Sequence, residues 1–247
     1  MSDILAVRGL HAGYGAGDIL KGIDVVVPRG EVVTIIGPNG SGKSTLIKTL
    51  AGLLSVREGE IVLDGARLNG LSAPQRVRAG LSYVPQEYNV FRNLTVYENL
   101  KIAHEFMGAR SKNGAKVLDD ELLALFPELP GKFRTLAGNL SGGQRQMLAF
   151  ACALTIQPKL LMLDEPSASL SPKYMADIFG TIKKVNSRGV TVFMVEQNAV
   201  GALRISDTCV VMANGRVRVT APAAEVLSKP DLQSLYLGDA RAQTGAS

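Results

Sequence analysis

Three short segments of this 247-residue chain carry residues whose types and spacing suit the chemistry of phosphate groups. In the first, a glycine is followed after four residues by Gly-Lys-Ser, and such a loop places backbone amides and the positive end of a helix dipole against phosphate oxygens. Lys43 supplies a positive charge to the β- and γ-phosphates, and the Ser44 hydroxyl is placed for Mg²⁺. The segment consists of Gly37, Pro38, Asn39, Gly40, Ser41, Gly42, Lys43, Ser44 and Thr45.

The second segment is a pair of carboxylates. Leu160 to Leu163 is an apolar run that predicts a buried strand, and Asp164 and Glu165 follow it directly. In an open parallel sheet the carboxyl edge of this strand lies beside the phosphate loop. Asp164 would hold the water shell of the metal, and Glu165 would polarise or deprotonate an attacking water, a general-base role worth about 10²- to 10⁴-fold in rate. The alternative is a surface acidic pair that caps the next segment.

The third segment, Leu140-Ser141-Gly142-Gly143-Gln144, lies between the other two. Ser141 is placed to cap a helix that runs through Ile156, and the amides of Gly142 and Gly143 at its start form a second anion site. The alternative is a plain capped helix start. The order of the three segments favours the anion site.

These segments alternate with strand and helix patterns. The alternation predicts an α/β fold with a core of parallel strands, antiparallel strands from about the first thirty residues packed alongside, and a helical insertion. A hairpin is predicted around Asn214-Gly215. The other predicted strands are Val32–Ile36, Ile61–Leu63, Leu81–Val84 and Val190–Val195, and the predicted helices are Lys43–Leu50, Thr95–Met107, Ala115–Phe126, the one after Ser141, and the one from Pro172 to about Ser187.

The composition, with 46% hydrophobic and 20% charged residues, is that of a globular protein that can bury a core. No run of about 18 uncharged apolar residues and no secretory signal occurs, so we expect a cytosolic protein. Cys152 and Cys209 are isolated, which favours reduced, buried thiols. The net charge of +5 is scattered, which favours a mildly basic surface over a nucleic-acid site and suits weak attraction to an anionic membrane face.

Taken together, the three segments resemble the motifs of ATP-binding cassette (ABC) ATPases, and the resemblance runs from Tyr14 to about Gly238. It implies a P-loop NTPase core with a parallel sheet, an antiparallel β subdomain and an inserted helical subdomain. Residues 1–238 would form a single ABC ATPase domain, with a RecA-like and antiparallel β lobe at 1–92 and 157–238, a helical lobe at 93–156, and a loose tail at 239–247. ATP and Mg²⁺ are the implied ligands.

The resemblance also assigns roles to residues outside the first two segments. Leu140 to Gln144 would contact ATP held by the phosphate loop of a second subunit, which implies a dimer. Gln86 resembles the Q-loop glutamine, which senses Mg²⁺ and the γ-phosphate, so the implied metal site comprises Ser44, Gln86 and Asp164. Tyr14 resembles the aromatic residue that stacks on adenine, with Gly13 and Gly15 leaving its ring accessible. The alternative for Tyr14 is a turn tyrosine packed on the core.

The chain departs from the family pattern at two positions. Gln197 stands where the family usually has a switch histidine, and an amide can hydrogen-bond phosphate but cannot become cationic. Ser171 stands where the family usually has aspartate after the carboxylates. The departures bear on communication across the dimer and on the rate at this chain's own site. Glu165, Gln86 and Gln197 are the expected catalytic residues.

At both positions the chain resembles one branch of the family, the ATPases of branched-chain amino-acid importers and their urea and amide relatives. That branch commonly pairs two unlike ATPases, so both a homodimer and a heterodimer with a paralogous ABC ATPase are open. The lipopolysaccharide-export ATPase is also similar, at Val84 to Glu87 and in the tail, but it normally keeps the histidine. The segments that resemble the importer branch are Val195–Ala199, Leu163–Ser167, Asn93–Val96 and Leu235–Gly238.

We therefore expect an ATPase that closes head-to-tail around two nucleotides and reopens after hydrolysis, peripheral on the inner face of the cell membrane. Its expected partners are integral-membrane permease subunits and, indirectly, an extracytoplasmic solute-binding protein, with no nucleic acid. Docking is expected near Gln86 and at Glu87 to Phe91, where Tyr88 and Phe91 offer apolar contacts. The alternatives are a soluble cassette ATPase acting on nucleic acid or ribosomes, and a non-hydrolysing regulatory module, against which the intact Glu165 argues.

Overall fold

The computed structural model of the chain describes residues 2–87, 89–107 and 120–228. Its central element is a six-stranded sheet in the order β10-β9-β3-β8-β7-β6. All of these strands run parallel except β10, which forms an antiparallel edge against β9. The bounds are β3 Val32–Ile36, β6 Leu81–Val84, β7 Leu160–Asp164, β8 Thr191–Val195, β9 Thr208–Ala213 and β10 Arg216–Pro222.

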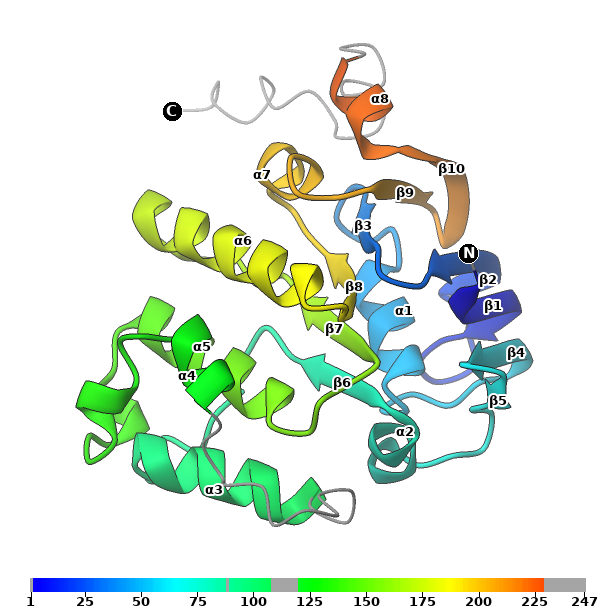
Figure 1. Cartoon of the computed structure of the whole chain (residues 1–247). Helices are drawn as coiled ribbons and strands as arrows, with labels where there is room; N and C mark the ends of the chain where they lie inside the picture. The colour runs from blue at the N-terminus through cyan, green and yellow to red at the C-terminus, as the bar shows by residue number, and fades with distance from the viewer. Residues whose placement is uncertain (1, 88, 108–119, 229–247) are drawn as a thin grey trace, which may run out of the picture.

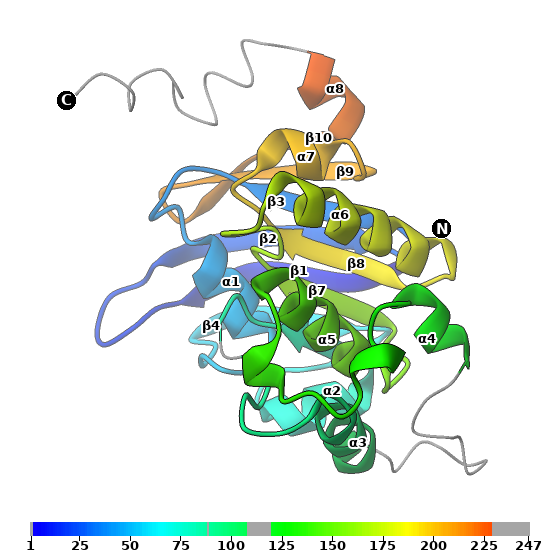
Figure 2. The ribbon, with the colours of Figure 1, turned by 90° about the vertical axis from the view of Figure 1, so that its left-hand side faces the viewer.

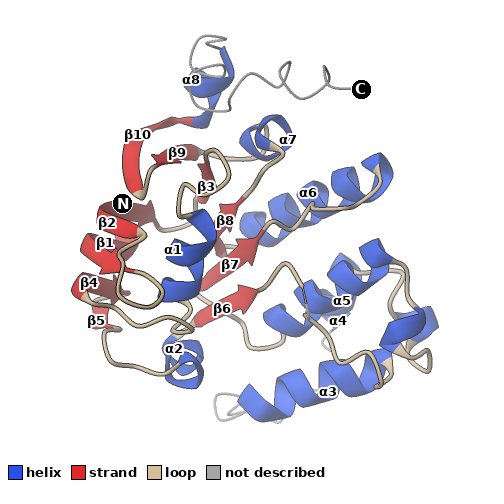
Figure 3. Ribbon diagram, turned by 180° about the vertical axis from the view of Figure 1, so that it is seen from behind, coloured by secondary structure: helices blue, strands red, loops and turns tan. Residues whose placement is uncertain are grey.

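A second, four-stranded antiparallel sheet has the order β2-β1-β4-β5. Its strands are β1 Asp3–Ala12, β2 Leu20–Pro28, β4 Glu58–Leu63 and β5 Ala66–Arg67. Helix α1 (Lys43–Leu50) lies between the two sheets, as Figures 1 and 3 show from opposite sides. The predicted parallel core and the antiparallel strands beside it are therefore both confirmed.

The remaining helices lie mostly across the central sheet from β1, β2 and β4. Helices α3 (Val96–Met107), α4 (Asp120–Leu125) and α5 (Gly142–Leu154) gather at one end of the molecule (Figure 1). Helix α6 (Pro172–Ser187) runs beside the central sheet (Figure 2). The shorter helices are α2 Ala73–Ala79, α7 Ala199–Leu203 and α8 Ala223–Ser228, with 3₁₀ turns at Pro130–Lys132 and Ala137–Asn139.

The central strands are buried on both faces. Every residue of β3, β7 and β8 is buried, as expected of parallel strands covered on both sides. Val33 and Ile35 pack with α1 and the antiparallel sheet, whereas Val32 packs with the cluster that contains α5 and α6. Because side chains alternate along a strand, these two layers fix the register of the strands and hence the edge at which each one ends.

Most of the predicted elements are found within a few residues of their expected bounds. Helix α5 ends at Leu154 rather than Ile156. Of the helix predicted over residues 115–126, the structure describes 120–125 as helical, and residues 115–119 lie outside the described residues, as do residues 229–247. The lobe boundaries remain a prediction, because buried side chains of α3, α5 and β7 belong to one continuous cluster.

The two cysteines differ. Both thiols are free, and Cys209 is buried as predicted. As a residue Cys152 is only half-buried, but burial of its thiol raises the pKa of Cys152 to about 12. Its side chain lines an apolar groove between the end of β6 and α3 and packs against the cluster that contains α5 and α6.

Candidate active site

The phosphate loop connects β3 to α1 at the carboxyl edge of the central sheet. Gly37 has no room for a side chain, because a Cβ there would lie 2.1 Å from the backbone oxygen of Met212. Gly42, at the N-cap of α1, has a φ of 100°, which glycine adopts without strain. The loop residues Pro38, Asn39 and Gly40 are exposed, whereas Ser41 is buried. The loop thus presents backbone to solvent at a helix N-terminus, as the sequence predicts.

Lys43 is turned into this loop. Its side chain is 5% exposed, and its Nζ donates to the carbonyl oxygens of Gly37 at 2.7 Å and Pro38 at 3.1 Å. Burial lowers the pKa of Lys43, while the nearby charges of Glu165 and Asp164 act in the opposite direction. The ammonium therefore lies within the electrostatic reach of both predicted acids.

Asp164 is the last residue of β7 and is almost fully buried. The Tyr83 hydroxyl on the neighbouring strand β6 donates to its Oδ2 at 3.1 Å. Burial raises the pKa of Asp164, which the Tyr83 hydrogen bond and the charges of Lys48 and Lys43 oppose. Its Oδ1 and the Ser41 Oγ are buried atoms without a hydrogen-bond partner in the described part of the chain. Such atoms need a ligand or an ordered water.

Glu165 follows Asp164 with a left-handed φ of 48° and a side chain only 7% exposed. Its backbone N–H donates to the carbonyl of Val195 at 2.9 Å, which ties it to the end of β8. The Gln197 amide nitrogen donates to both carboxylate oxygens, at 2.9 and 3.0 Å. The structure thus brings together two of the predicted catalytic residues, and it orients the Glu165 carboxylate through an uncharged partner.

Glu196 is a buried carboxylate behind this pair that the sequence reasoning missed. It is 1% exposed and accepts from the backbone N–H and hydroxyl of Ser167 at 2.9 and 3.0 Å. It also accepts from the N–H groups of Gln197 at 3.1 Å and Asn198 at 3.3 Å. Burial raises the pKa of Glu196, against these hydrogen bonds. One side chain therefore joins the segment after Glu165 to the segment that carries Gln197.

The Leu140 to Gln144 segment starts helix α5 as predicted. Ser141 is the N-cap: its Oγ accepts from the Gln144 N–H at 3.2 Å, and the Gln144 side chain accepts from the Ser141 N–H at 3.2 Å. Gly143 has a packing role that the sequence did not indicate, since a Cβ there would lie 2.3 Å from the Tyr174 ring of α6. Gly142 and Ser141 are exposed at the helix tip.

Gln86 lies two residues after the end of β6. It is exposed and lines a cavity of about 470 Å³ together with Gly142 of α5 and Ser169 of the segment after Glu165. This cavity therefore joins the predicted Q-loop to the tip of α5. The predicted metal role of Gln86 stays a prediction, as do the roles of the other site residues.

Tyr14 is 54% exposed, on the loop between β1 and β2. The ring is therefore not enclosed by the core, and the choice between the adenine role and a turn tyrosine packed on the core stays a prediction. The ring is free to meet a ligand, in keeping with the adenine role that the resemblance implies.

The ABC transporter family model matches residues 20–168, more than half of the chain. The chain belongs to the ABC transporter family. Among curated ABC relatives, it is 43% identical to the probable branched-chain amino acid transport ATP-binding protein LivF of Archaeoglobus fulgidus, over 93% of this chain and 96% of that one. It is 42% identical to the high-affinity branched-chain amino acid transport ATP-binding protein BraG of Pseudomonas aeruginosa, over 91% and 95%.

The more distant ABC relatives include the lipopolysaccharide export system ATP-binding protein LptB of Haemophilus influenzae, at 31% identity over 96% of this chain and 98% of that one. Among solved structures, the ADP conformation of an ATP-binding cassette of an ABC transporter matches with a TM-score of 0.82 at 27% identity, covering 97% of this chain and all of that one. A dimeric post-hydrolysis cassette bound to ADP and Pi matches with a TM-score of 0.76 at 26% identity, covering 89% and 98%. The expected ABC ATPase fold is thereby confirmed, and the chain is an ABC ATP-binding subunit.

Proposed function

We propose that this chain hydrolyses MgATP within a pair of cassettes and so powers the import of branched-chain amino acids or a related small polar solute. The observation that carries the proposal is the placement of Glu165, buried at the carboxyl edge of the sheet and oriented by Gln197. The solute class is supported by the names of the LivF and BraG relatives, branched-chain amino acid transport ATP-binding proteins at 43% and 42% identity. The lipopolysaccharide-export relative is less similar, at 31%.

The phosphate loop binds the triphosphate through its backbone amides at the start of α1. Lys43 exchanges the carbonyls of Gly37 and Pro38 for the β- and γ-phosphates, and it neutralises charge that grows on them during transfer. The Ser41 hydroxyl, buried without a partner among the described residues, fits a further phosphate contact.

Mg²⁺ fits the residues at the end of β7. The unpartnered Oδ1 of Asp164 is a hard oxygen ligand of the kind that Mg²⁺ prefers, and Ser44 and Gln86 would complete the protein's share of the site. Among the described residues no group of three or more His, Cys, Asp or Glu side chains could hold a metal by itself, so such an ion needs phosphate and water ligands. When bound, Mg²⁺ neutralises charge on the phosphates.

Glu165 performs the proton transfer. A water attacks the γ-phosphorus in line with the bond to the bridging oxygen; that bond breaks, ADP leaves, and the Glu165 carboxylate accepts the proton of the water. Gln197 holds both oxygens of Glu165 by uncharged donors, so it orients the base without contributing a proton of its own.

The second cassette supplies the tip of helix α5. The exposed Ser141 and Gly142 at a capped helix N-terminus are suited to a γ-phosphate held by another subunit. A dimeric cassette with ADP and Pi among the structural relatives supports this arrangement. Both a homodimer and a heterodimer with a paralogous cassette agree with it.

Membrane permease subunits would dock in an apolar groove of about 450 Å³ at the carboxyl end of β6. The groove is lined by Phe91 and Leu53, which are 58% and 59% exposed, and by Ile102 of α3. No helix among the described residues is long and apolar enough to cross a membrane. In this arrangement the cassette would act from the inner face of the membrane, and a solute-binding protein would deliver cargo to the permease. Of the predicted docking residues, Tyr88 lies outside the described residues.

Phosphate release by the wild type and by Glu165→Gln tests the enzymatic part of the proposal. We expect kcat to fall about 10²- to 10⁴-fold, since the amide cannot accept the proton of the water. The control Glu60→Gln changes a carboxylate on the antiparallel sheet and should leave kcat unchanged. Equal phosphate release from the wild type and Glu165→Gln would remove the proton-transfer role from Glu165.

Transport assays in vesicles test the docking part. Phe91→Ser together with Ile102→Ser removes apolar contacts from the groove, whose lining includes no residue of the phosphate loop, so solute uptake should fall while basal ATP hydrolysis persists. The double substitution Val26→Ser and Val200→Ser, at two other exposed apolar positions, serves as the control. Unchanged uptake by the Phe91 and Ile102 variant would place the permease elsewhere.

A further inference from the structure

The loop that carries Tyr14 has little of its own to hold it in place. It joins β1 to β2 and has glycine at positions 13, 15 and 17. Gly15 adopts a φ of 58°, and a Cβ on Gly13 would lie 2.1 Å from the carbonyl oxygen of Gly17, so the bend requires glycine at both positions. Because glycine loses the most conformational freedom on ordering, the Tyr14 ring has a fixed position only if other groups hold this loop.

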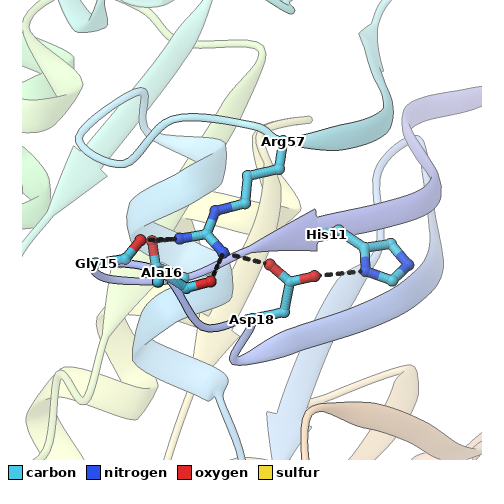
Figure 4. A network of polar contacts seen from close by, with 6 residues as sticks. His11, Gly15, Ala16, Asp18 and Arg57 are labelled. Carbon is cyan, nitrogen blue, oxygen red and sulfur yellow. Dashed lines mark hydrogen bonds and ion pairs between the residues drawn. The ribbon is translucent and has the colours of Figure 1, made fainter.

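Arg57, directly before β4, makes such contacts (Figure 4). Its Nη2 donates to the carbonyl of Gly13 at 3.3 Å and to the carbonyl of Gly15, and its Nη1 donates to the carbonyl of Ala16 at 3.3 Å. The backbone N–H of Arg57 donates to the carbonyl of His11 at 2.9 Å, which anchors the arginine to the end of β1. One side chain from outside the loop thus reaches three of the four carbonyls from Gly13 to Ala16.

Asp18 completes the arrangement at the other end of the loop. Its Oδ1 accepts from Arg57 Nη1 at 2.7 Å, and its Oδ2 lies 3.0 Å from His11 Nδ1 (Figure 4). The hydrogen bond with His11, helped by Arg57, lowers the pKa of Asp18. A guanidinium has five N–H donors in a fixed planar fork, whereas a lysine ammonium has one nitrogen, so only arginine can hold these carbonyls and the carboxylate together.

We infer that Arg57 is a positioning residue of the adenine site, which fixes the loop from Gly13 to Asp18 so that the exposed Tyr14 ring meets the base. The inference rests on the proposed ATP site, and it deepens that proposal by separating two sources of affinity. Lys43 and the phosphate loop bind the phosphates, whereas the affinity for the base depends on an arginine of the antiparallel sheet region that touches no part of the phosphate loop among its described contacts.

Titration calorimetry on the full-length chain tests the inference. The ligands are ADP and inorganic pyrophosphate, neither of which has a γ-phosphate to be hydrolysed. Arg57→Met should weaken ADP binding by about 2- to 12-fold, the range expected for loss of an aromatic stacking contact, and leave pyrophosphate binding unchanged. Tyr14→Ala should do the same. The double variant should bind ADP no more weakly than Tyr14→Ala alone, because both changes remove one contact.

Two controls separate positioning from a general effect of losing an arginine. Arg67→Met removes an arginine of the same sheet, whose exposed ion pair with Glu60 spans 3.5 Å, and should leave both affinities unchanged. Arg57→Lys keeps the charge without the fork and should give an intermediate ADP affinity. Melting curves establish folding, and if Arg57→Met does not fold, Arg57→Lys and its double variant with Tyr14→Ala carry the comparison.

Several results would overturn the inference. Wild-type ADP affinity in Arg57→Met, with weakened affinity in Tyr14→Ala, removes the role of Arg57 and leaves the proposed function intact. Equal weakening of ADP and pyrophosphate assigns Arg57 a general structural effect. An unchanged ADP affinity in Tyr14→Ala contradicts the adenine role of Tyr14 itself, and the role of Arg57 falls with it.

Discussion

The two ends of the nucleotide site are held in different ways. At the phosphate end, the loop from Gly37 to Gly42 connects a fully buried strand to α1, and Gly37 is packed against the backbone of Met212. At the adenine end, residues 14–18 of the loop are exposed, and Arg57 holds this loop from another strand region. The comparison teaches that a rigid core builds the phosphate end, whereas a polar surface contact builds the adenine end.

The difference also appears in the charges. Lys43 and Asp164 at the phosphate end are buried, so their interactions are little screened by solvent. The side chains of Arg57 and Asp18 are 30% and 35% exposed, and exposed ion pairs contribute little to stability. We therefore expect substitutions at the phosphate end to affect catalysis and folding strongly, and those at the adenine end to affect affinity for the base with little effect on folding.

Among the substitutions that compare the two ends, Lys43→Ala has the largest expected effect. Removal of the buried ammonium takes away a positive charge from the transferred phosphate, so kcat for ATP hydrolysis should fall by about 10²- to 10³-fold. The control Lys101→Ala removes an exposed lysine of α3 that pairs with Glu105. Steady-state phosphate release measures both, and a Lys43→Ala rate within a few-fold of the wild type would contradict the assignment of the phosphate end.

Next in size is the difference between two glycines. Gly37→Ala places a Cβ 2.1 Å from the backbone oxygen of Met212 in β9, and it should lower the free energy of unfolding by about 1–3 kcal/mol or more. At Gly17 a Cβ would meet no atom within 4 Å, and the φ of Gly17 is not positive. Gly17→Ala should therefore raise that free energy by about 0.4–1 kcal/mol, because alanine reduces the conformational entropy of the unfolded chain. Urea unfolding measures the free energy of unfolding of both variants. Equal changes in the two variants would contradict the distinction between a packed loop at Gly37 and an open loop at Gly17.

A third change tests the hydrogen bonds of Glu196, which join the segment after Glu165 to the segment that carries Gln197. Glu196→Gln replaces one acceptor oxygen with an NH₂ group, which cannot accept from the N–H groups of Ser167 or Gln197. The segment after Glu165 and the segment that carries Gln197 should therefore both shift. We expect kcat to fall about 10-fold or more, with the Kd for ADP unchanged, because neither segment belongs to the phosphate loop. If Kd rises and kcat stays constant in rapid kinetics and calorimetry, Glu196 does not act through Glu165.

The smallest expected effect concerns Asp18 and pH. Because its folded-state pKa lies below the ordinary value of 3.8, ionised Asp18 contributes stability above that pH, and the contribution is lost as pH falls through the lowered folded value. Asp18→Asn should therefore lower the melting temperature slightly at pH 7, with the difference closing below about pH 4. Asp3→Asn, at an exposed carboxylate of β1, is the control. A difference that grows on acidification would contradict the sign of the shift.

The fold and the phosphate end could be predicted from the sequence because their signals are local. The bounds of β3, α1 and β6 agree with the prediction, since each is a short run with one periodicity and clear turn residues. The N-cap at Ser141 was predictable for the same reason, because a capping box involves residues three apart. The end of α5 was placed two residues too late, since the apolar Ile156 follows Leu154 and extends the apolar pattern past the end of the helix.

The contacts that orient the side chains could not be predicted in this way. Tyr83 meets Asp164 only because β6 and β7 lie side by side, and Gly143 meets Tyr174 only because α5 packs on α6. Glu196 looked like a member of a family motif until burial placed it among the N–H groups of Ser167 and Asn198. Apart from Asn198, each of these partners is far away in sequence, and no local pattern encodes the distance between the paired residues.

The sequence by itself determined the chemistry: phosphate-binding amides next to Lys43, two carboxylates after an apolar strand, and a capped helix tip at Ser141. Tertiary structure alone decided how that chemistry is held, with Gln197 on both oxygens of Glu165 and Arg57 on the loop of Tyr14. The reason is physical. A motif fixes which groups the backbone presents within a few residues, whereas hydrogen bonds between distant segments exist only after burial of the apolar faces has brought those segments together.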